Sequence, residues 1–290
     1  MEYTLKNKKL TVVFESKGAT LHSIKDNDGV EYLWEGNPEY WSGQAPVLFP
    51  ICGSIRDDKA QIGNRKQTNM PRHGVVRKKE FKCVEQTENS ILFEIESNEE
   101  MLAQYPYEFK LGINYILEGK KITTRYIIEN KDKEIMPFQI GGHPGFHCPL
   151  YKEESYEVVF EQKETCTVPT PVTETGLIDM EHRSEFLKDT DTLPLKHDLF
   201  SVDAVILDQL KSRAVTLKSK KHNKGIRIDF NQFPYLILWS TAKEADFVAL
   251  EPWIGLSTCS DEGDKFEEKR NIQYAQAGEV KEYEFHINIL

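Results

Sequence analysis

The chain has 290 residues, of which 39% are hydrophobic and 29% are charged, so it is too apolar to be disordered and can bury a sizeable core. It carries 37 Lys and Arg against 47 Asp and Glu, a formal charge of −10. Such a surface disfavours nucleic-acid and anionic-membrane partners but does not exclude small ligands. Apolar runs fall short of the roughly 18 residues that a membrane-spanning helix needs.

The five cysteines are odd in number and scattered, and they contain no C-x-x-C pair: Cys52, Cys83, Cys148, Cys166 and Cys259. This pattern argues against a disulfide framework and for reduced thiols. The first residues also lack the apolar core of a signal peptide. We therefore expect a cytoplasmic protein, a monomer or homodimer, whose partner is a small molecule rather than nucleic acid or a membrane.

Strand patterns recur at short intervals from the N-terminus onward. Residues 9–15 and 19–25 come first, and the second strand runs into the turn Asp26-Asn27-Asp28-Gly29. Two hairpins are then predicted, the first joining residues 80–86 to 90–96 and the second joining 107–117 to 121–129. A turn or two of helix is expected near residues 99–104.

The second half continues in strands, with apolar residues alternating clearly in 225–230. Further strands are predicted at residues 202–207, 215–218, 235–241, 247–250 and 281–289. No linker or fixed-period repeat divides the chain, although residues 174–198 are polar and are expected to be rich in loops. Many strands with turns every 8–12 residues or so predict a single all-β domain over residues 1–290, a large antiparallel β-sandwich. A barrel or a propeller also fits the pattern alone.

The segment Gly141-Gly142-His143-Pro144-Gly145 is unusual for a sandwich strand. Its glycines let the backbone approach a ligand, and the proline biases His143 to an extended conformation at the strand end. Alternation places Gln139, Gly141 and His143 on one face, which predicts room for a substrate beneath the imidazole. The alternative is a histidine held at a strand end by ordinary hydrogen bonds.

Glu251 interrupts an otherwise apolar strand, on the same predicted face as Phe247 and Trp253. Desolvation among aromatic rings should raise the pKa of this carboxyl, which suits a general base. Trp253 suits the C–H face of a sugar ring. A structural glutamate paired with an arginine across the sheet is the alternative.

His73 lies between Arg72 and Gly74 and could equally be a turn residue. Arg56, Arg72 and Arg77 surround it in sequence, and they could orient hydroxyls or a phosphate, or be solvated surface charges. His143 and His147 are four residues apart, but Pro144-Gly145 makes a helical zinc pair improbable. No nucleophile elbow, phosphate loop or dinucleotide motif occurs in the sequence.

Four motifs give the chain a resemblance to the aldose 1-epimerase (galactose mutarotase-like) superfamily, in its LacX-like branch. They occur in the family's order and span most of the chain: 48–53 (Leu-Phe-Pro-Ile-Cys-Gly), 70–74 (Met-Pro-Arg-His-Gly), 141–150 (Gly-Gly-His-Pro-Gly-Phe, then Cys-Pro-Leu after His147) and 250–255 (Leu-Glu-Pro-Trp-Ile-Gly). The resemblance implies a β-supersandwich whose site lies in a cleft across one sheet.

It further implies catalytic roles for Glu251 as base, His143 as acid and His73 near the ring oxygen, without a metal or other cofactor. Arg77, Arg56, Trp253 and Gln139 are the expected substrate-binding residues. The chain departs from the family pattern at Val75-Val76, where such proteins often carry Phe-Ala, and at residues 257–260, where an aspartate is common and Asp261 is a shifted substitute. These departures bear on substrate preference.

The expected activity is the interconversion of α and β anomers of aldohexoses by acid/base ring opening. A sugar-binding sensor without turnover is the competing class, and a glycoside hydrolase would need a second carboxylate opposite Glu251. We expect free hexoses to be better substrates than their 6-phosphates, because the net charge opposes a dianion and Asp57 and Asp58 follow Arg56. The arginines leave a hexose-6-phosphate mutarotase as the alternative.

Overall fold

The computed structural model describes residues 1–63, 65, 68–148 and 156–290. Pro149 and Leu150, which belong to one of the motifs above, lie outside the described residues. No helix in the described part of the chain is both long and apolar enough to cross a lipid bilayer.

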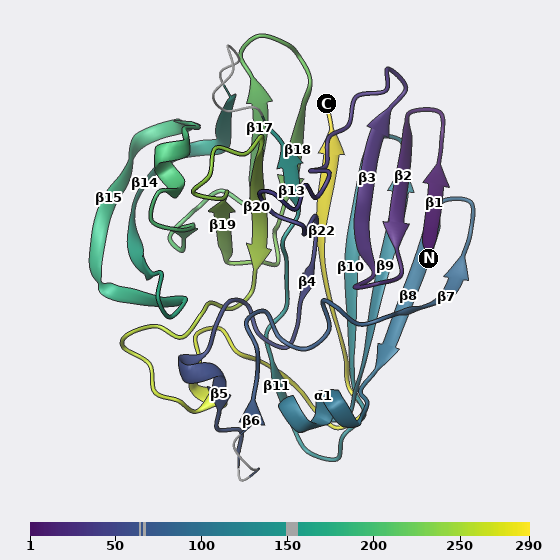
Figure 1. Cartoon of the computed structure of the whole chain (residues 1–290), viewed down its shortest axis with the longest axis vertical. Coiled ribbons are helices and arrows are strands. Elements are labelled where there is room, and N and C mark those ends of the chain that lie inside the picture. The colour runs from purple at the N-terminus through teal and green to yellow at the C-terminus, as the bar shows by residue number, and fades with distance from the viewer. Residues whose placement is uncertain (64, 66–67, 149–155) are drawn as a thin grey trace.

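A nine-stranded antiparallel sheet forms one layer of the molecule. Its strands, in spatial order, are β15 (Leu177–Pro194), β14 (Tyr156–Val172), β17 (Ala214–Ser219), β18 (Gly225–Asp229), β22 (Val280–Ile289), β10 (Lys121–Asn130), β9 (Phe109–Glu118), β8 (Ser90–Glu96) and β7 (Lys82–Gln86). The sheet runs across the whole width of the molecule in Figure 1.

Two smaller sheets form the opposite layer. The three-stranded one contains β1 (Glu2–Lys6), β2 (Leu10–Glu15) and β3 (Thr20–Asp26). The six-stranded one has the order β16 (Val205–Leu207), β19 (Tyr235–Trp239), β20 (Phe247–Trp253), β12 (Gly141–Gly142) and β4 (Val47–Leu48), with β13 (Gly145–His147) also paired to β20. Both lie over the nine-stranded sheet in Figure 1.

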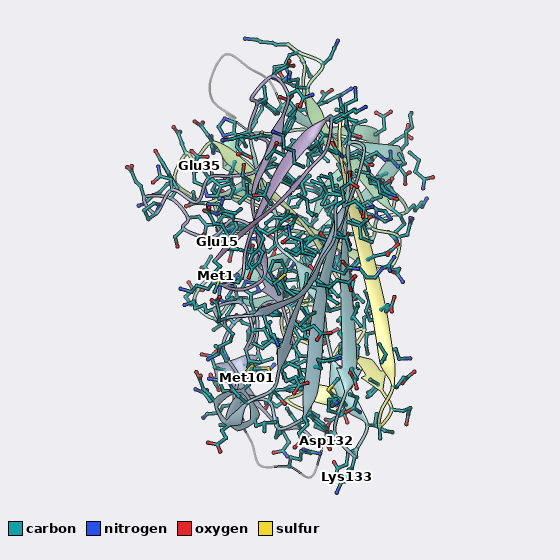
Figure 2. All side chains as sticks on the ribbon, turned by 90° about the vertical axis from the view of Figure 1, so that its right-hand side faces the viewer. Met1, Glu15, Glu35, Met101, Asp132 and Lys133 are labelled. Carbon is teal, nitrogen blue, oxygen red and sulfur yellow. The ribbon has the colours of Figure 1, made fainter. Side chains whose placement is uncertain are left out.

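Short elements close the ends of this sandwich. They are the pairs β5 (Lys59–Ala60) with β6 (Thr68–Asn69) and β11 (Met136–Phe138) with β21 (Gln273–Ala275), the helix α1 (Glu99–Gln104), and single 3-10 turns at Arg56–Asp58, His197–Phe200 and Phe266–Glu268. Figure 2 places Met101 of α1 toward the same end as Asp132 and Lys133, which follow β10.

The core lies between the two layers and follows from alternation along the strands. Every second side chain of β9 from Phe109 to Leu117 is buried, and β2 alternates in the same way. Phe14 of β2 contacts Phe93 of β8 and Tyr115 of β9. One continuous cluster of buried apolar residues extends from Leu5 to Ile289. The expected all-β sandwich is therefore confirmed.

Most predicted elements lie where the sequence indicated. Both hairpins form, as β7–β8 and β9–β10, and α1 covers residues 99–104, with the Asn98 side chain accepting a hydrogen bond from the Met101 amide at 2.9 Å. The expectation of a loop-rich segment at residues 174–198 was wrong, because β15 occupies Leu177–Pro194. Its pairing with β14 contains four register shifts, and each shift interrupts the alternation on which strand prediction depends.

Candidate active site

A cavity of about 270 Å³ opens on the six-stranded sheet and brings together the two histidines, the buried glutamate and three tryptophans. Its size suits a ligand smaller than a typical drug molecule. It is bordered by Trp41, Pro46, Arg72, His73, Arg77, His143, Asp203, Ala204, Ile237, Trp239, Glu251 and Trp253. The sequence motifs at residues 70–77, 141–146 and 250–255 thus meet in space.

Glu251 lies on the floor of the cavity, on β20, and only 1% of its surface is exposed. Its Oε2 accepts a hydrogen bond from the indole Nε1 of Trp253 at 3.1 Å. Burial raises the pKa of Glu251 well above the usual range, although the charge of Arg72 and the Trp253 hydrogen bond oppose the shift. This carboxyl therefore holds a proton more tightly than a glutamate in water.

His143, between β12 and β13, is 7% exposed and has its Nε2 3.3 Å from Oε2 of Glu251. Its ring lies against the indoles of Trp41 and Trp239, at centroid distances of 4.9 and 5.4 Å. Burial lowers the pKa of His143 to about 3, and the charges of Arg72 and Arg77 act in the same direction.

The two facing groups share one proton. Burial disfavours both the carboxylate and the imidazolium, so the state with one proton in total and no net charge is favoured over an isolated charge of either sign. That proton can lie on Glu251 or, after transfer across the 3.3 Å gap, on His143. The arrangement can accept a proton at one atom and deliver one at the other.

His73 follows β6 in a left-handed conformation, with a φ of 66°, and is 6% exposed. Gly74 comes next at φ 78°, where a Cβ would lie 2.0 Å from the carbonyl oxygen of Phe49, so only glycine fits. The Gly53 amide donates to Nδ1 of His73 at 3.1 Å. A backbone amide can only donate, so the neutral ring carries its hydrogen on Nε2.

Burial, followed by the charges of His143, Arg72 and Arg77, lowers the pKa of His73 well below the usual range. Its ring meets those of His143 and Trp253 edge to face, with centroids 5.6 and 5.7 Å apart. His73 is thus a neutral ring presenting one N–H, beside the acid/base pair rather than within it.

Two predicted substrate-binding residues, Arg77 and Trp253, border the cavity, but Arg56 and Gln139 do not. Arg56 pairs with Asp264 at 2.5 Å and donates to the carbonyl of Glu262. Gln139 is fully buried, and its Oε1 accepts from the Cys52 amide at 3.0 Å. Both side chains hold neighbouring loops, and their role in substrate binding stays a prediction.

The glycines before His143 serve packing, and the expectation that they leave room for a substrate was wrong. A Cβ on Gly141 would lie 3.0 Å from both Cys52 Sγ and the Trp253 ring, and a Cβ on Gly142 would lie 2.8 Å from the Tyr126 hydroxyl. The small residues let β12 sit close to the layer beneath it. The cavity is bordered instead by three tryptophans, Trp41, Trp239 and Trp253.

Sequence reasoning missed Trp41, Trp239 and Asp203. Trp239 ends β19 and lies opposite Ala249 of β20, so aligning the two predicted strands would have placed it near Glu251. Trp41 comes from a loop, and Asp203 lies just before β16, in residues that the sequence predicts as the start of that strand. His147 lies away from the cavity, 41% exposed and 3.9 Å from Glu35, so it diverges from His143 as expected for an extended segment.

Comparison with known proteins identifies the family. A family model described as Aldose 1-epimerase matches residues 1–272. The chain belongs to the aldose 1-epimerase family. The plasmid-encoded protein LacX of Lactococcus lactis subsp. lactis is 47% identical over 298 residues, with all of both chains covered.

Solved structures agree with this membership. A galactose mutarotase related enzyme from Lactobacillus acidophilus is 29% identical, with a TM-score of 0.93 over 100% of this chain and 97% of that one. A galactose mutarotase-like protein from Lactobacillus casei is also 29% identical, with a TM-score of 0.89 over the whole of both chains. Family and fold together support a mutarotase-type function for this epimerase family member.

Proposed function

We propose that the protein is an aldose 1-epimerase that interconverts the α and β anomers of an aldohexose. The observation that carries the proposal is the facing of Glu251 and His143 at 3.3 Å on the floor of a sugar-sized cavity. The two oxygens that exchange protons in mutarotation, the C1 hydroxyl and the ring oxygen, are bonded to the same carbon. An acid and a base only a few ångströms apart can therefore serve both.

The chemistry is a balanced pair of proton transfers. Glu251, as the carboxylate, takes the proton of the C1 hydroxyl while protonated His143 gives one to the ring oxygen, and the C1–O5 bond breaks to leave an open aldehyde. Rotation about C1–C2 presents the other face of the carbonyl. The reverse transfers then close the ring as the opposite anomer and restore both groups.

The remaining residues around the cavity position the sugar. The Nε2–H of His73 can donate to the ring oxygen or a neighbouring hydroxyl, and Arg77 can donate to hydroxyls farther along the ring. Trp253, Trp239 and Trp41 offer apolar faces to the C–H groups of the sugar. A modest acceleration suffices, because mutarotation already proceeds in water and each acid or base contributes about 10²–10⁴-fold.

Asp203 is a reason to test a second candidate, a glycoside hydrolase. This carboxylate borders the same cavity, and its charge helps to raise the pKa of Glu251 after the larger effect of burial. Hydrolysis would use Asp203 and Glu251 as a carboxyl pair across the glycosidic bond. The contact between Glu251 and His143 favours the epimerase, since a hydrolase has no need of an acid at the ring oxygen.

NMR exchange spectroscopy tests the proposal directly on equilibrated sugars. Saturation should pass between the α and β C1 signals of glucose or galactose at a rate proportional to protein concentration. A binding protein without turnover would broaden these signals and leave their exchange at the uncatalysed rate. Exchange at that rate for every aldose tested, or release of sugar from aryl glycosides in an Asp203-dependent way, would contradict the proposal.

A further inference from the structure

A second hollow, of about 650 Å³, adjoins the first. The two share Trp41, Pro46 and Arg77 in their walls, so they form one depression with Arg77 at the junction. The outer part is bordered by Lys17 and Lys78 and by one carboxylate, Glu15, which lies on the outer surface on the same side as Met1 in Figure 2.

The cations around this depression have no carboxylate partner among the described residues, in a chain of net charge −10. Six of the nine arginines pair with carboxylates, and Arg213 donates to backbone carbonyls. Within the part of the chain that the structure describes, Arg72 and Arg77 have neither kind of partner. Lys17 and Lys78 likewise form no ion pair within the described part, while Glu15 is turned toward His22 at 3.7 Å.

Arg72 and Gly53 compete for the ring of His73. The Arg72 Nε donates to Nε2 at 3.4 Å, and the Gly53 amide donates to Nδ1 at 3.1 Å. A neutral imidazole has one acceptor nitrogen, so only one of these bonds can form at a time, and the shorter one from Gly53 is favoured. Within the described chain Arg72 then lacks an acceptor, which a ligand oxygen would supply.

The unpaired guanidinium groups act on the neighbouring groups. After the effect of burial, Arg72 lowers the pKa of Arg77, and both arginines lower the pKa of His143 and His73. An anion bound between the arginines would reverse these effects. It would favour protonated His143, the form that the proposed mechanism needs as its acid.

We propose that the substrate is a phosphorylated aldose, with its anomeric carbon at Glu251 and His143 and its phosphate, at the other end of the sugar, bound in the outer hollow by Arg77, Lys17 and Lys78. This proposal rests on the proposed function and names its substrate class. Arg77 can bind two phosphate oxygens at once, and the lysines add point charges. The acidic exterior does not forbid this, because a cationic cleft concentrates its own field.

The opposite expectation, that free hexoses are preferred, relied in part on neutralisation of Arg56 by its acidic neighbours. The structure removes that argument, because Arg56 is tied to Asp264 outside the cavity. Among the described residues, the cations that border the two hollows are Arg72, Arg77, Lys17 and Lys78, and the carboxylates are Glu15, Asp203 and Glu251.

The test compares kcat/KM for glucose, galactose, glucose 6-phosphate, galactose 6-phosphate and glucuronate, using the anomer exchange measurement with the uncatalysed rate subtracted. At least one of the two sugar phosphates should exceed its free sugar by tenfold or more. The Arg77→Gln variant should reduce this advantage by about 10–100-fold, the usual worth of a charge-assisted contact. The double variant Lys17→Gln/Lys78→Gln should reduce it by about tenfold, mainly through KM.

Lys120→Gln is the matched control, since it removes one positive charge in the exposed β9–β10 turn and should leave the ratio unchanged. Free hexoses turned over as well as their phosphates, or a phosphate advantage that survives both variants, would overturn the inference and leave the proposed function standing. An equal advantage for glucuronate would show recognition of charge rather than phosphate and would also overturn it. Absence of exchange for all five sugars would remove the proposed function and this inference together.

Discussion

The floor and the rim of the cavity are built in different ways. Glu251 and His143 on the floor are almost fully buried, and adjacent paired strands fix their backbones: β20 is bonded on one side to β19 and on the other to β12 and β13. Arg72 and Asp203 on the rim come from loops and are at least partly exposed. The floor is suited to moving protons between fixed atoms, and the rim to choosing and holding the ligand.

The rim also depends on an irregular part of the nine-stranded sheet. The β14–β15 ribbon curves at one side of the molecule in Figure 1, and Gly176 lies in the turn that joins its strands. A Cβ on Gly176 would lie 2.7 Å from Ser54 Oγ and 3.2 Å from a terminal nitrogen of Arg72. Residues Ile178 and Cys259 form a bridge close by. The ribbon thus helps to hold Arg72 in place.

Substitutions on the floor should have the largest effects. Glu251→Gln and His143→Asn keep nearly the same shapes and each remove one proton-transfer partner, so each should lower kcat by about 10²–10⁴-fold. The double variant should be little worse than either single one, because the two groups act as a unit. Anomer exchange rates check this, with circular dichroism as the folding control. Retention of more than about a tenth of wild-type kcat in Glu251→Gln would exclude it as the base.

His73 lies between the floor and the rim, so its substitution should change both kcat and KM. His73→Asn keeps an acceptor for the Gly53 amide, tolerates the positive φ and loses the Nε2–H, so kcat/KM should fall by about tenfold, through both kcat and KM. His73→Gln can restore a donor near the Nε2 position and should retain more activity. Equal losses in the two variants would indicate that His73 only supports the loop.

Rim substitutions should change KM more than kcat, by a few-fold. Gly176→Ala places a Cβ against Arg72 and should raise KM by about threefold while lowering the free energy of unfolding by about 1–2 kcal/mol. Gly119→Ala is the control: Gly119 has a similar φ of 60° in the β9–β10 turn, and nothing lies within 4 Å of an added Cβ. Thermal unfolding and KM check both variants. A threefold change of KM in both would show that strain alone is responsible.

The β9–β10 hairpin and the β14–β15 ribbon show which parts of the fold could be predicted from the sequence. In β9–β10 the residues pair in unbroken register, one face is buried, and a short turn joins the strands, so alternation alone predicts the hairpin. In β14–β15 the register shifts repeatedly, and Pro169 and Pro171 lie within the first strand. Neither strand keeps a period of two, and the ribbon could not be recognised.

The residues of the candidate site also include some that could be predicted from the sequence and some that could not. Glu251 and His143 stood out because a carboxylate within an apolar strand and a histidine among glycines are costly without a reason. Trp41 and Asp203 come from loops, and their approach to the cavity is decided by long-range packing. The structure separates Arg56 from Arg77, because closeness in sequence says nothing about which way a side chain in a loop will turn.

The pH dependence of kcat/KM for anomer exchange tests the central claim, that Glu251 and His143 share one proton, most directly. The measurement uses a free hexose, which has no group that titrates in this range, so this parameter reports the ionisation of the free enzyme. A sugar phosphate would add its own titration at about pH 6. His143 has a lowered pKa of about 3 and Glu251 a raised one, so the singly protonated pair persists from below the ordinary glutamate pKa to well above it. As pH falls, the pair gains its second proton, on His143, only near the lower value. As pH rises, Glu251 loses the shared proton only above its usual range.

Activity should therefore hold its plateau between pH 6.5 and 4.5, the ordinary pKa values of the two side chains, in protein shown to stay folded. An acid limb centred at or above 4.5 would mean that Glu251 ionises as an ordinary carboxylate, and would contradict the account.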